Sequence, residues 1–183
     1  GLAPAAHGAN RTRRMFTGDR SGDWLYRALQ RAGLANQPES ERRGDGLRLS
    51  GVYVTATVRC APPDNRPKPS ERKMCRRYLE REMDVLLPGL EVVVALGGYA
   101  YRHVMRIFRD REWNVPSPMP DFGHGAEVDL ARPPIQNANY NSIISEVTLL
   151  CSYHPSQQNT FTGTLTEEMF DGIWERALEL RDG

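Results

Sequence analysis

Three segments of the chain have the continuous apolar character of buried β-strands. They are residues 51–60 (GVYVTATVRC), 91–98 (EVVVALGG) and 146–156 (EVTLLCSYHPS), and β-branched and aliphatic side chains dominate each of them. Such runs are typical of parallel strands that are covered on both faces. The sequence therefore predicts three buried strands, of which residues 91–98 have the clearest pattern.

Apolar residues at helical spacing separate these strands. The spacing predicts helices over residues 21–34, 70–87, 99–108 and 164–182. Ser70 and Thr166 are suitable N-caps for the second and the last of these helices, because their hydroxyls can accept a hydrogen bond from a free amide in the first turn.

Two stretches interrupt the periodicity. Residues 61–69 contain four prolines in nine residues and predict a loop. Residues 110–145 contain five prolines and the polar run QNANYNS, and predict a loop or hairpin with little order. The alternation of strand and helix elsewhere indicates an α/β fold with a doubly wound, three-layer sheet, and we expect a single domain over residues 1–183.

Ligands bind to sheets of this kind at the carboxyl ends of the strands. Three segments are expected at that edge: the opening loop 1–19, the loop 59–63 (RCAPP) and the turn 153–159 (YHPSQQN). These segments lie far apart in the chain. We therefore predict one composite site that is built from distant loops.

Composition narrows the class of protein without naming a function. The chain is 39% hydrophobic and 26% charged, which indicates a folded domain. Its net charge of +1 means that any nucleic-acid binding depends on local patches, such as the arginines of segments 11–14 and 59–77. No signal-peptide pattern and no membrane-length apolar run is present, so we expect a cytoplasmic protein that does not bind membranes.

The three cysteines do not suggest a disulfide framework. Their number is odd, which favours free thiols or metal ligands. Cys60 and Cys75 flank the proline-rich loop, but two thiols alone are a weak metal signal, since such sites normally use four ligands. Cys151 lies in an apolar strand and is expected to be a small buried hydrophobe.

The candidate chemistry centres on His154, which follows a buried strand and precedes a proline. A lone histidine there is most often a structural, hydrogen-bonded residue. The polar side chains of residues 156–159 favour a ligand site instead, because they suit a flat, hydrogen-bonding ligand and phosphates. Phe16 is either core filler or a surface on which a base stacks. Asn10 and Asp19 can equally hold the opening loop through bonds to its backbone.

Several motifs together resemble one known family. GLAPAAHGANRT, RMFTGDRSGDWLY, VRCAPPDN, VALGG, FGHG and YHPSQQNTFTG occur in an order similar to that of the family 5 uracil-DNA glycosylases, the iron–sulfur type, over residues 1 to about 181. The resemblance implies a uracil-DNA glycosylase-like fold in which an apolar strand and a first cysteine pair precede Gly1. It also implies that Cys60 and Cys75 are half of the ligand set of a structural [4Fe–4S] cluster.

The resemblance further implies a monofunctional glycosylase of base excision repair. It would act as a monomer on double-stranded and single-stranded DNA, and would remove uracil and other deaminated bases by hydrolysis. Uracil would stack on Phe16 while His154 donates a hydrogen bond to the uracil oxygen that gains charge. Asn10 is the first candidate to position water, with Asp19 behind it, because the motif carries Ala3 where related families place an acidic or amide side chain.

The other residues implied at the substrate are Ala3, Ser156, Gln157 and Asn159. The two arginine-rich segments are expected along the DNA backbone. The alternative hypothesis is a non-catalytic iron–sulfur DNA-binding module on the same fold. Arg13 stands where the motif leads us to expect glycine, so it either strains a turn that favours glycine or adds a phosphate contact.

Overall fold

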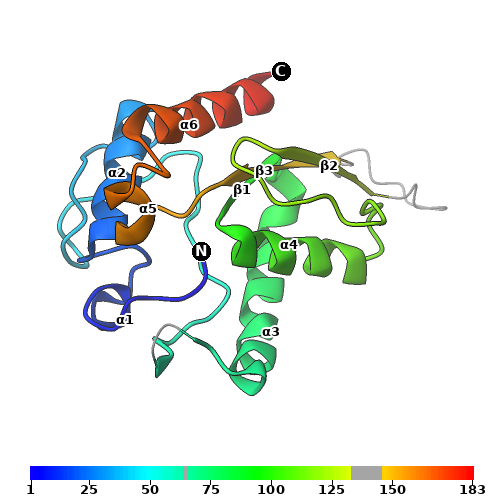
Figure 1. Cartoon of the computed structure of the whole chain (residues 1–183), viewed down its shortest axis with the longest axis horizontal. Coiled ribbons are helices and arrows are strands. Elements are labelled where there is room, and N and C mark those ends of the chain that lie inside the picture. Colours follow the sequence, from blue (N-terminus) through cyan, green and yellow to red (C-terminus); the bar gives the residue numbers. More distant parts are fainter. Residues whose placement is uncertain (64–65, 133–145) are drawn as a thin grey trace.

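The computed structural model describes residues 1–63, 66–132 and 146–183. A small sheet lies between two layers of helices (Figure 1). The elements are α1 (Ala9–Thr12), α2 (Arg20–Arg31), α3 (Pro69–Leu86), the 3₁₀ turn η2 (Leu87–Gly89), β1 (Val92–Leu96), α4 (Gly98–Asp110), β2 (Glu127–Ala131), β3 (Glu146–Ser152), α5 (Gln157–Phe161) and α6 (Glu167–Asp182). No helix within the described ranges is long and apolar enough to cross a membrane.

The sheet has three strands in the order β1-β3-β2. β1 pairs with β3 in parallel, with Val94 opposite Leu150, which confirms two of the three strands expected from the sequence. β2 pairs with β3 in the antiparallel sense and lies within the stretch that was expected to be a loop or hairpin. The polar run 136–142 of that stretch lies outside the described residues.

Each face of the sheet carries its own hydrophobic core. On one face, Tyr101 and Phe108 of α4 are buried together with side chains of α3, β2 and β3. On the other face, Leu29 of α2 packs with Phe170 and Trp174 of α6. Full burial of a large apolar side chain contributes roughly 1.5–3 kcal/mol, so both layers hold the fold together. This arrangement confirms the doubly wound, three-layer class.

Helices α2 and α6 are also joined by charge. The Arg31 guanidinium donates two hydrogen bonds to the Asp171 carboxylate, at 2.8 and 2.6 Å. Thr166 caps α6 as predicted, and its hydroxyl accepts a bond from the amide of Met169. These contacts fix one helical layer on the sheet.

The predicted cap of α3 was wrong. The helix begins at Pro69 rather than after Ser70, and the amide of Lys68 donates to the Glu71 carboxylate at 2.7 Å. Proline is favoured at the first helical position, because its backbone angle is preset and it has no amide to satisfy there.

The predicted strand at 51–60 was also wrong. The segment is extended, but its main chain bonds to the opening residues only over 55–58. There the amides of Thr57 and Val58 donate to the carbonyls of Gly1 and Leu2, and the carbonyl of Thr55 accepts from the amino group of Gly1. A strand requires a continuous hydrogen-bonded neighbour, and the described residues provide none along 51–54.

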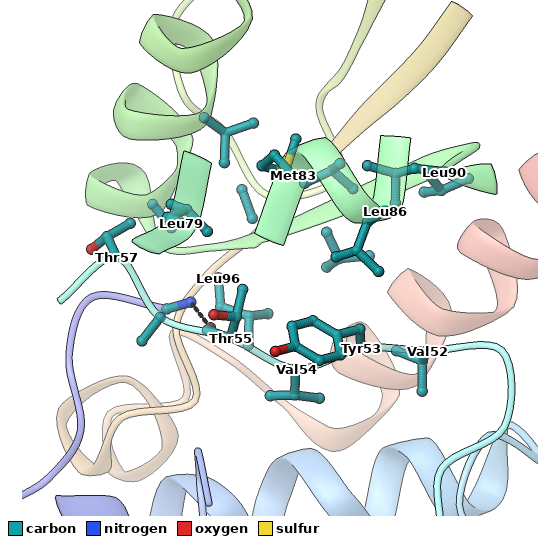
Figure 2. Close-up of a pocket in the computed structure, with 18 of the residues that line it drawn as sticks. Val52, Tyr53, Val54, Thr55, Thr57, Leu79, Met83, Leu86, Leu90 and Leu96 are labelled. Carbon is teal, nitrogen blue, oxygen red and sulfur yellow. Dashed lines mark hydrogen bonds between the residues drawn. The ribbon is translucent and has the colours of Figure 1, made fainter. Parts of the chain in front are cut away.

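Instead, an apolar slot separates this segment from β1. The slot encloses about 430 Å³ and lies between residues 51–57 and the edge of β1 on which no described strand pairs. Figure 2 shows side chains of α3, among them Leu79 and Met83, on one side of the slot, with Val52 and Val54 opposite. We call this space the apolar slot.

The opening segment contains a left-handed turn at Arg13, which was one of the two alternatives for this residue. Arg13 follows α1 with φ +59°, in the left-handed region that favours glycine. Its amide donates to the carbonyl of Ala9 at 2.8 Å, so the turn closes the helix despite the strain.

Candidate active site

A pocket of about 400 Å³ lies where the opening segment meets the turn after β3. We call it the His154 pocket. Its lining residues are Ala3, Pro4, Ala5, Met15, Phe16, Asp19, Arg20, Ser21, His154, Ser156, Gln157 and Gln158. Six of the residues proposed from the sequence are therefore brought together here. The loop 59–63 does not line the pocket.

His154 is fixed in the wall of this pocket by its main chain. Its carbonyl accepts bonds from the amide of Ser156 at 2.7 Å and from the side-chain amide of Asn159 at 2.9 Å. Gly97, which follows β1, passes so close that a Cβ there would lie 3.3 Å from that of His154. The histidine is thus held at the carboxyl ends of β1 and β3, where the sequence placed it.

Burial lowers the pKa of His154 to about 4. The imidazole is therefore neutral at pH 7 and carries one N–H. A neutral ring is a hydrogen-bond donor that does not add a positive charge to the pocket. Such a group suits a ligand oxygen on which negative charge grows.

The ring of Phe16 lies beside that imidazole. The two ring centroids are 5.7 Å apart and the planes are tilted by 31°. Phe16 adopts φ +55°, a conformation that is uncommon for a bulky residue and that the surrounding structure must impose.

Contacts on both sides of Phe16 hold it there. The hydroxyl of Tyr26 donates to the carbonyl of Met15 at 2.7 Å. Gly22 of α2 lies so close to the Phe16 main chain that a Cβ would approach the Phe16 carbonyl oxygen to 1.8 Å. The aromatic wall of the pocket is therefore fixed to helix α2.

Arg14 belongs to this support and is not a free DNA contact, which corrects one of the sequence predictions. Its guanidinium forms a bidentate pair with Asp45 at 2.9 and 2.6 Å, and donates to the hydroxyls of Thr17 and Ser40. The same guanidinium holds the pKa of the Asp45 carboxyl well below its usual range. Because Arg14 and Asp45 are 31 residues apart, no local sequence pattern indicates that they pair.

Two arginines of segment 59–77 are also engaged within the protein. Arg59 pairs with Glu82 at 2.6 Å, and Arg76 bonds Glu80 and Asp110. Among the described residues, Arg72 and Lys73 have no ion pair. The prediction that segment 59–77 contacts the DNA backbone therefore applies only to those of its cations that form no ion pair among the described residues.

Asn10 and Asp19 occupy different environments. Asn10 lies outside the pocket, and its side-chain oxygen accepts a bond from the amide of Ala61 at 3.2 Å, so it joins the opening segment to the loop after Cys60. Asp19 lines the pocket and caps α2, because one carboxylate oxygen accepts from the amide of Gly22 at 2.9 Å. Its second oxygen accepts no bond from any described residue.

Ser156 and Asn159 both hold the turn after β3, and Ser156 also lines the pocket. Ser156 is the N-cap of α5, and its hydroxyl accepts from the amide of Asn159. Asn159 does not line the pocket, and its side chain supports His154 from behind. Sequence reasoning missed Arg20, which lines the pocket and lies over the ring of Phe161 at 4.4 Å.

The cysteines remain free thiols in the structure. Cys60 is exposed and Cys75 is half-buried, while Cys151 is buried. Within the described ranges, no three side chains of His, Cys, Asp or Glu are grouped as a metal site. Burial raises the pKa of the Cys151 thiol to about 11, which agrees with its expected role as an inert core residue.

Comparison with known proteins connects this geometry to one superfamily. The sequence model described as "Uracil DNA glycosylase superfamily" matches residues 1–178. The "Type-5 uracil-DNA glycosylase" of Mycobacterium bovis is 48% identical over 98% of this chain and 61% of its own length. The protein of the same description from Thermus thermophilus is 49% identical over 93% of this chain and 68% of its own.

More distant similarity covers a smaller part. A "Type-4 uracil-DNA glycosylase" of Archaeoglobus fulgidus is 39% identical over 34% of this chain. The chain spans about three fifths of the length of its mycobacterial relative.

Proposed function

Since the chain belongs to the uracil-DNA glycosylase superfamily and is similar to type-5 members over nearly its whole length, we propose that it excises uracil from DNA. The reaction is hydrolysis of the N-glycosidic bond, which initiates base excision repair, and other deaminated bases are further substrates. The single observation that carries this proposal is the pairing of a fixed aromatic ring, Phe16, with the neutral imidazole of His154 in one pocket.

Base removal requires that the nucleotide leave the duplex. Flipping costs a few kcal/mol, and less for a mispaired base, so a pocket that accepts the extruded base can recover this cost. The His154 pocket, at about 400 Å³, provides an aromatic face for stacking and polar side chains at Ser156 and Gln157 for hydrogen bonding. Ala3 has a small side chain, so the base can approach the backbone of the opening segment closely.

Chemistry at the pocket follows from its two polar groups. As the glycosidic bond breaks, negative charge grows on the uracil oxygens, and the N–H of His154 stabilises it there. One well-placed donor of this kind contributes roughly 10²–10³ in rate. The second carboxylate oxygen of Asp19 is available to orient water toward the sugar carbon. We therefore assign that role to Asp19 rather than to Asn10, which is bonded to Ala61 outside the pocket.

The DNA partner is both double-stranded and single-stranded, and the protein acts as a monomer in the cytoplasm. Unpaired cations at Arg72 and Lys73 of α3 would contact phosphates. Arg20 at the pocket rim would contact the nucleotide that carries the target base.

Cys60 and Cys75 would supply two thiolates of a [4Fe–4S] cluster, and two more would come from a segment that precedes Gly1. The chemistry of the donors fits, because both thiols are free and neither is fully buried. The cluster would fix the proline-rich loop, to which Asn10 is already bonded, and would take no part in base removal. Cys75→Ser in the chain with its upstream residues should abolish bound iron, whereas Cys151→Ala should not. Unchanged iron in the first variant would contradict the assignment.

The apolar slot would hold a strand from that same preceding segment. Its two long sides offer an edge of β1 and the backbone of 52–54, neither of which bonds to another main chain among the described residues, and its lining is mostly apolar. An added strand would complete a sheet that includes residues 51–60. Hydrogen exchange of the β1 amides should then slow in a chain that carries the upstream residues, and equal exchange in both chains would exclude this placement.

Single-turnover excision from a duplex with one uracil tests the proposed function. His154→Ala should lower the rate by at least ~10²-fold with little change in DNA affinity, because its bond strengthens as charge develops. His7→Ala is the matched control, since His7 is exposed and does not line the pocket. If the unmodified protein binds the duplex and excises nothing, the alternative, a non-catalytic DNA-binding module, replaces this proposal.

A further inference from the structure

We propose that His124 is a positioning residue for His154. Just after β3 ends, the His124 imidazole accepts a hydrogen bond from the main-chain amide of Tyr153, in the place where a carbonyl would otherwise accept it. This bond fixes the backbone next to His154. The inference rests on the proposed function, because it assigns a second histidine to the same site. His124 lies in the FGHG motif, to which sequence reasoning gave no role.

A ladder of main-chain hydrogen bonds runs beside the end of β3. The amide of Cys151 donates to the carbonyl of Ala126, and the amide of Gly125 donates to the carbonyl of Cys151, both at 2.8 Å. Two residues further, just beyond the end of β3, the next amide on this edge belongs to Tyr153. It donates to Nδ1 of His124 at 3.2 Å instead of to a carbonyl. The side chain therefore extends the ladder by one bond.

The other ring nitrogen determines which tautomer makes this bond. Nε2 of His124 lies 3.2 Å from the carbonyl oxygen of Met169, in the first turn of α6. A carbonyl only accepts, so Nε2 carries the hydrogen and Nδ1 carries the lone pair. That is the tautomer the Tyr153 amide requires. Burial also lowers the pKa of His124, which favours the neutral ring.

Protonation would oppose this arrangement. A hydrogen on Nδ1 would face the amide hydrogen of Tyr153, and the bond would be lost. The ring of Tyr153 packs against that of His124 with centroids 5.1 Å apart, so the contact is both polar and apolar. His124 thus joins β3, α6 and the pocket turn.

The consequence for His154 follows from its position one residue after Tyr153. Its carbonyl is held on the far side by Asn159, and Ser152 on the near side accepts from the amide of Gly97 at 2.8 Å. Between these anchors, the bond to His124 is the one that fixes the Tyr153 amide. A displacement of about 1 Å at a reacting group can cost 10²-fold in rate, so this anchor affects catalysis without touching substrate.

Two isosteric variants separate the two bonds of the ring. His124→Asn places an amide near the position of Nδ1 and keeps an acceptor for Tyr153, but it loses the bond to Met169. His124→Gln reaches the position of Nε2 and keeps the bond to Met169, but it loses the acceptor for Tyr153. Both remove one hydrogen bond, so they serve as controls for each other in stability.

The experiment measures single-turnover uracil excision, duplex affinity and the urea midpoint for both variants. We expect His124→Asn to stay within about threefold of the unmodified rate, and His124→Gln to fall at least about tenfold with unchanged affinity. NMR of ¹⁵N-labelled histidine should show His124 with its hydrogen on Nε2. The imidazole signals of His154 should move in His124→Gln and remain in place in His124→Asn.

The inference would be overturned if both variants lost rate equally and in proportion to their losses of stability. His124 would then have a structural role only. A hydrogen on Nδ1 in the unmodified protein would overturn it as well. These outcomes are distinct from failure of the proposed function, in which the unmodified protein itself excises no uracil. The NMR measurements need no activity and decide the positioning role in either case.

Discussion

Gly22→Ala should disable the pocket while leaving the fold in place. A Cβ at position 22 would lie 1.8 Å from the carbonyl oxygen of Phe16 and 2.6 Å from its carbonyl carbon, and both atoms are backbone. Ordinary contact begins near 3.4 Å, so the Phe16 main chain must retreat from α2 by about 1.6 Å (3.4 minus 1.8). This movement carries the ring away from His154, from which its centroid now lies 5.7 Å.

The magnitude follows from that displacement. A misplacement of about 1 Å can cost 10²-fold in rate, so we expect excision to fall by at least ~10²-fold. Overpacking costs about 1–3 kcal/mol, but alanine gains up to about 1 kcal/mol over glycine within a helix. The net loss of stability should therefore be about 0–2 kcal/mol, which is less than the roughly 5–15 kcal/mol by which native domains are usually stable, so the variant should remain folded.

Gly172→Ala is the matched control. Gly172 also lies inside a helix, α6, and no atom lies within 4 Å of a Cβ built there. This variant should keep full activity and gain about 0.5–1 kcal/mol in urea unfolding. If Gly22→Ala excises uracil as fast as Gly172→Ala, then Phe16 is not held by α2 in the way described, and its position does not limit the reaction.

Three further predictions concern stability and DNA binding. Arg13→Gly should raise the free energy of unfolding by about 1 kcal/mol, because it relieves a left-handed residue, and an unchanged urea midpoint would contradict this. The pKa of His154 is about 4 in the folded protein and near 6.5 in the unfolded chain, so the unfolded state binds more protons between these pH values. The free energy of unfolding should therefore fall as the pH drops from about 6.5 to about 4. His154→Gln should flatten this dependence. Arg72→Gln should reduce the log–log salt slope of duplex binding by about 0.9, whereas Arg176→Gln, which loses only pairs with Glu127 and Glu179, should leave it unchanged; equal slopes in all three proteins would return Arg72 to an ordinary solvated surface.

Local pattern was sufficient for most of the fold. The strands at 91–98 and 146–156 and all four long helices follow from apolar spacing, because each pattern is satisfied within one element or between two clear partners. Residues 51–60 have the same composition, yet they form no strand in the described structure. Hydrogen-bond pairing is a property of neighbours in space, and composition alone does not supply a neighbour.

The sequence predicted the site residues that belong to a motif. It failed for residues whose bonding partners are distant in the chain. Phe16 and His154 come together as the resemblance implied. Arg14 was taken for a DNA contact because its pairing with Asp45 crosses a loop and leaves no mark in the sequence. Asn10 was ranked before Asp19 from the sequence, whereas in the structure Asn10 is bonded to Ala61 outside the pocket and Asp19 lines it.

The two walls of the His154 pocket are each bonded to a helix, and this has a consequence for hydrogen exchange. Phe16 is fixed to α2 through Gly22 and Tyr26, while the turn at His154 is linked to α6 through Met169. Because α2 and α6 share one core and the Arg31–Asp171 pair, the walls cannot separate unless the helices do. Loops at catalytic sites usually open easily, but these should open only with the helical layer. The amides of Gly22 and Tyr153 should therefore exchange at the slow rate of α2 and α6, as parts of one cooperative unit.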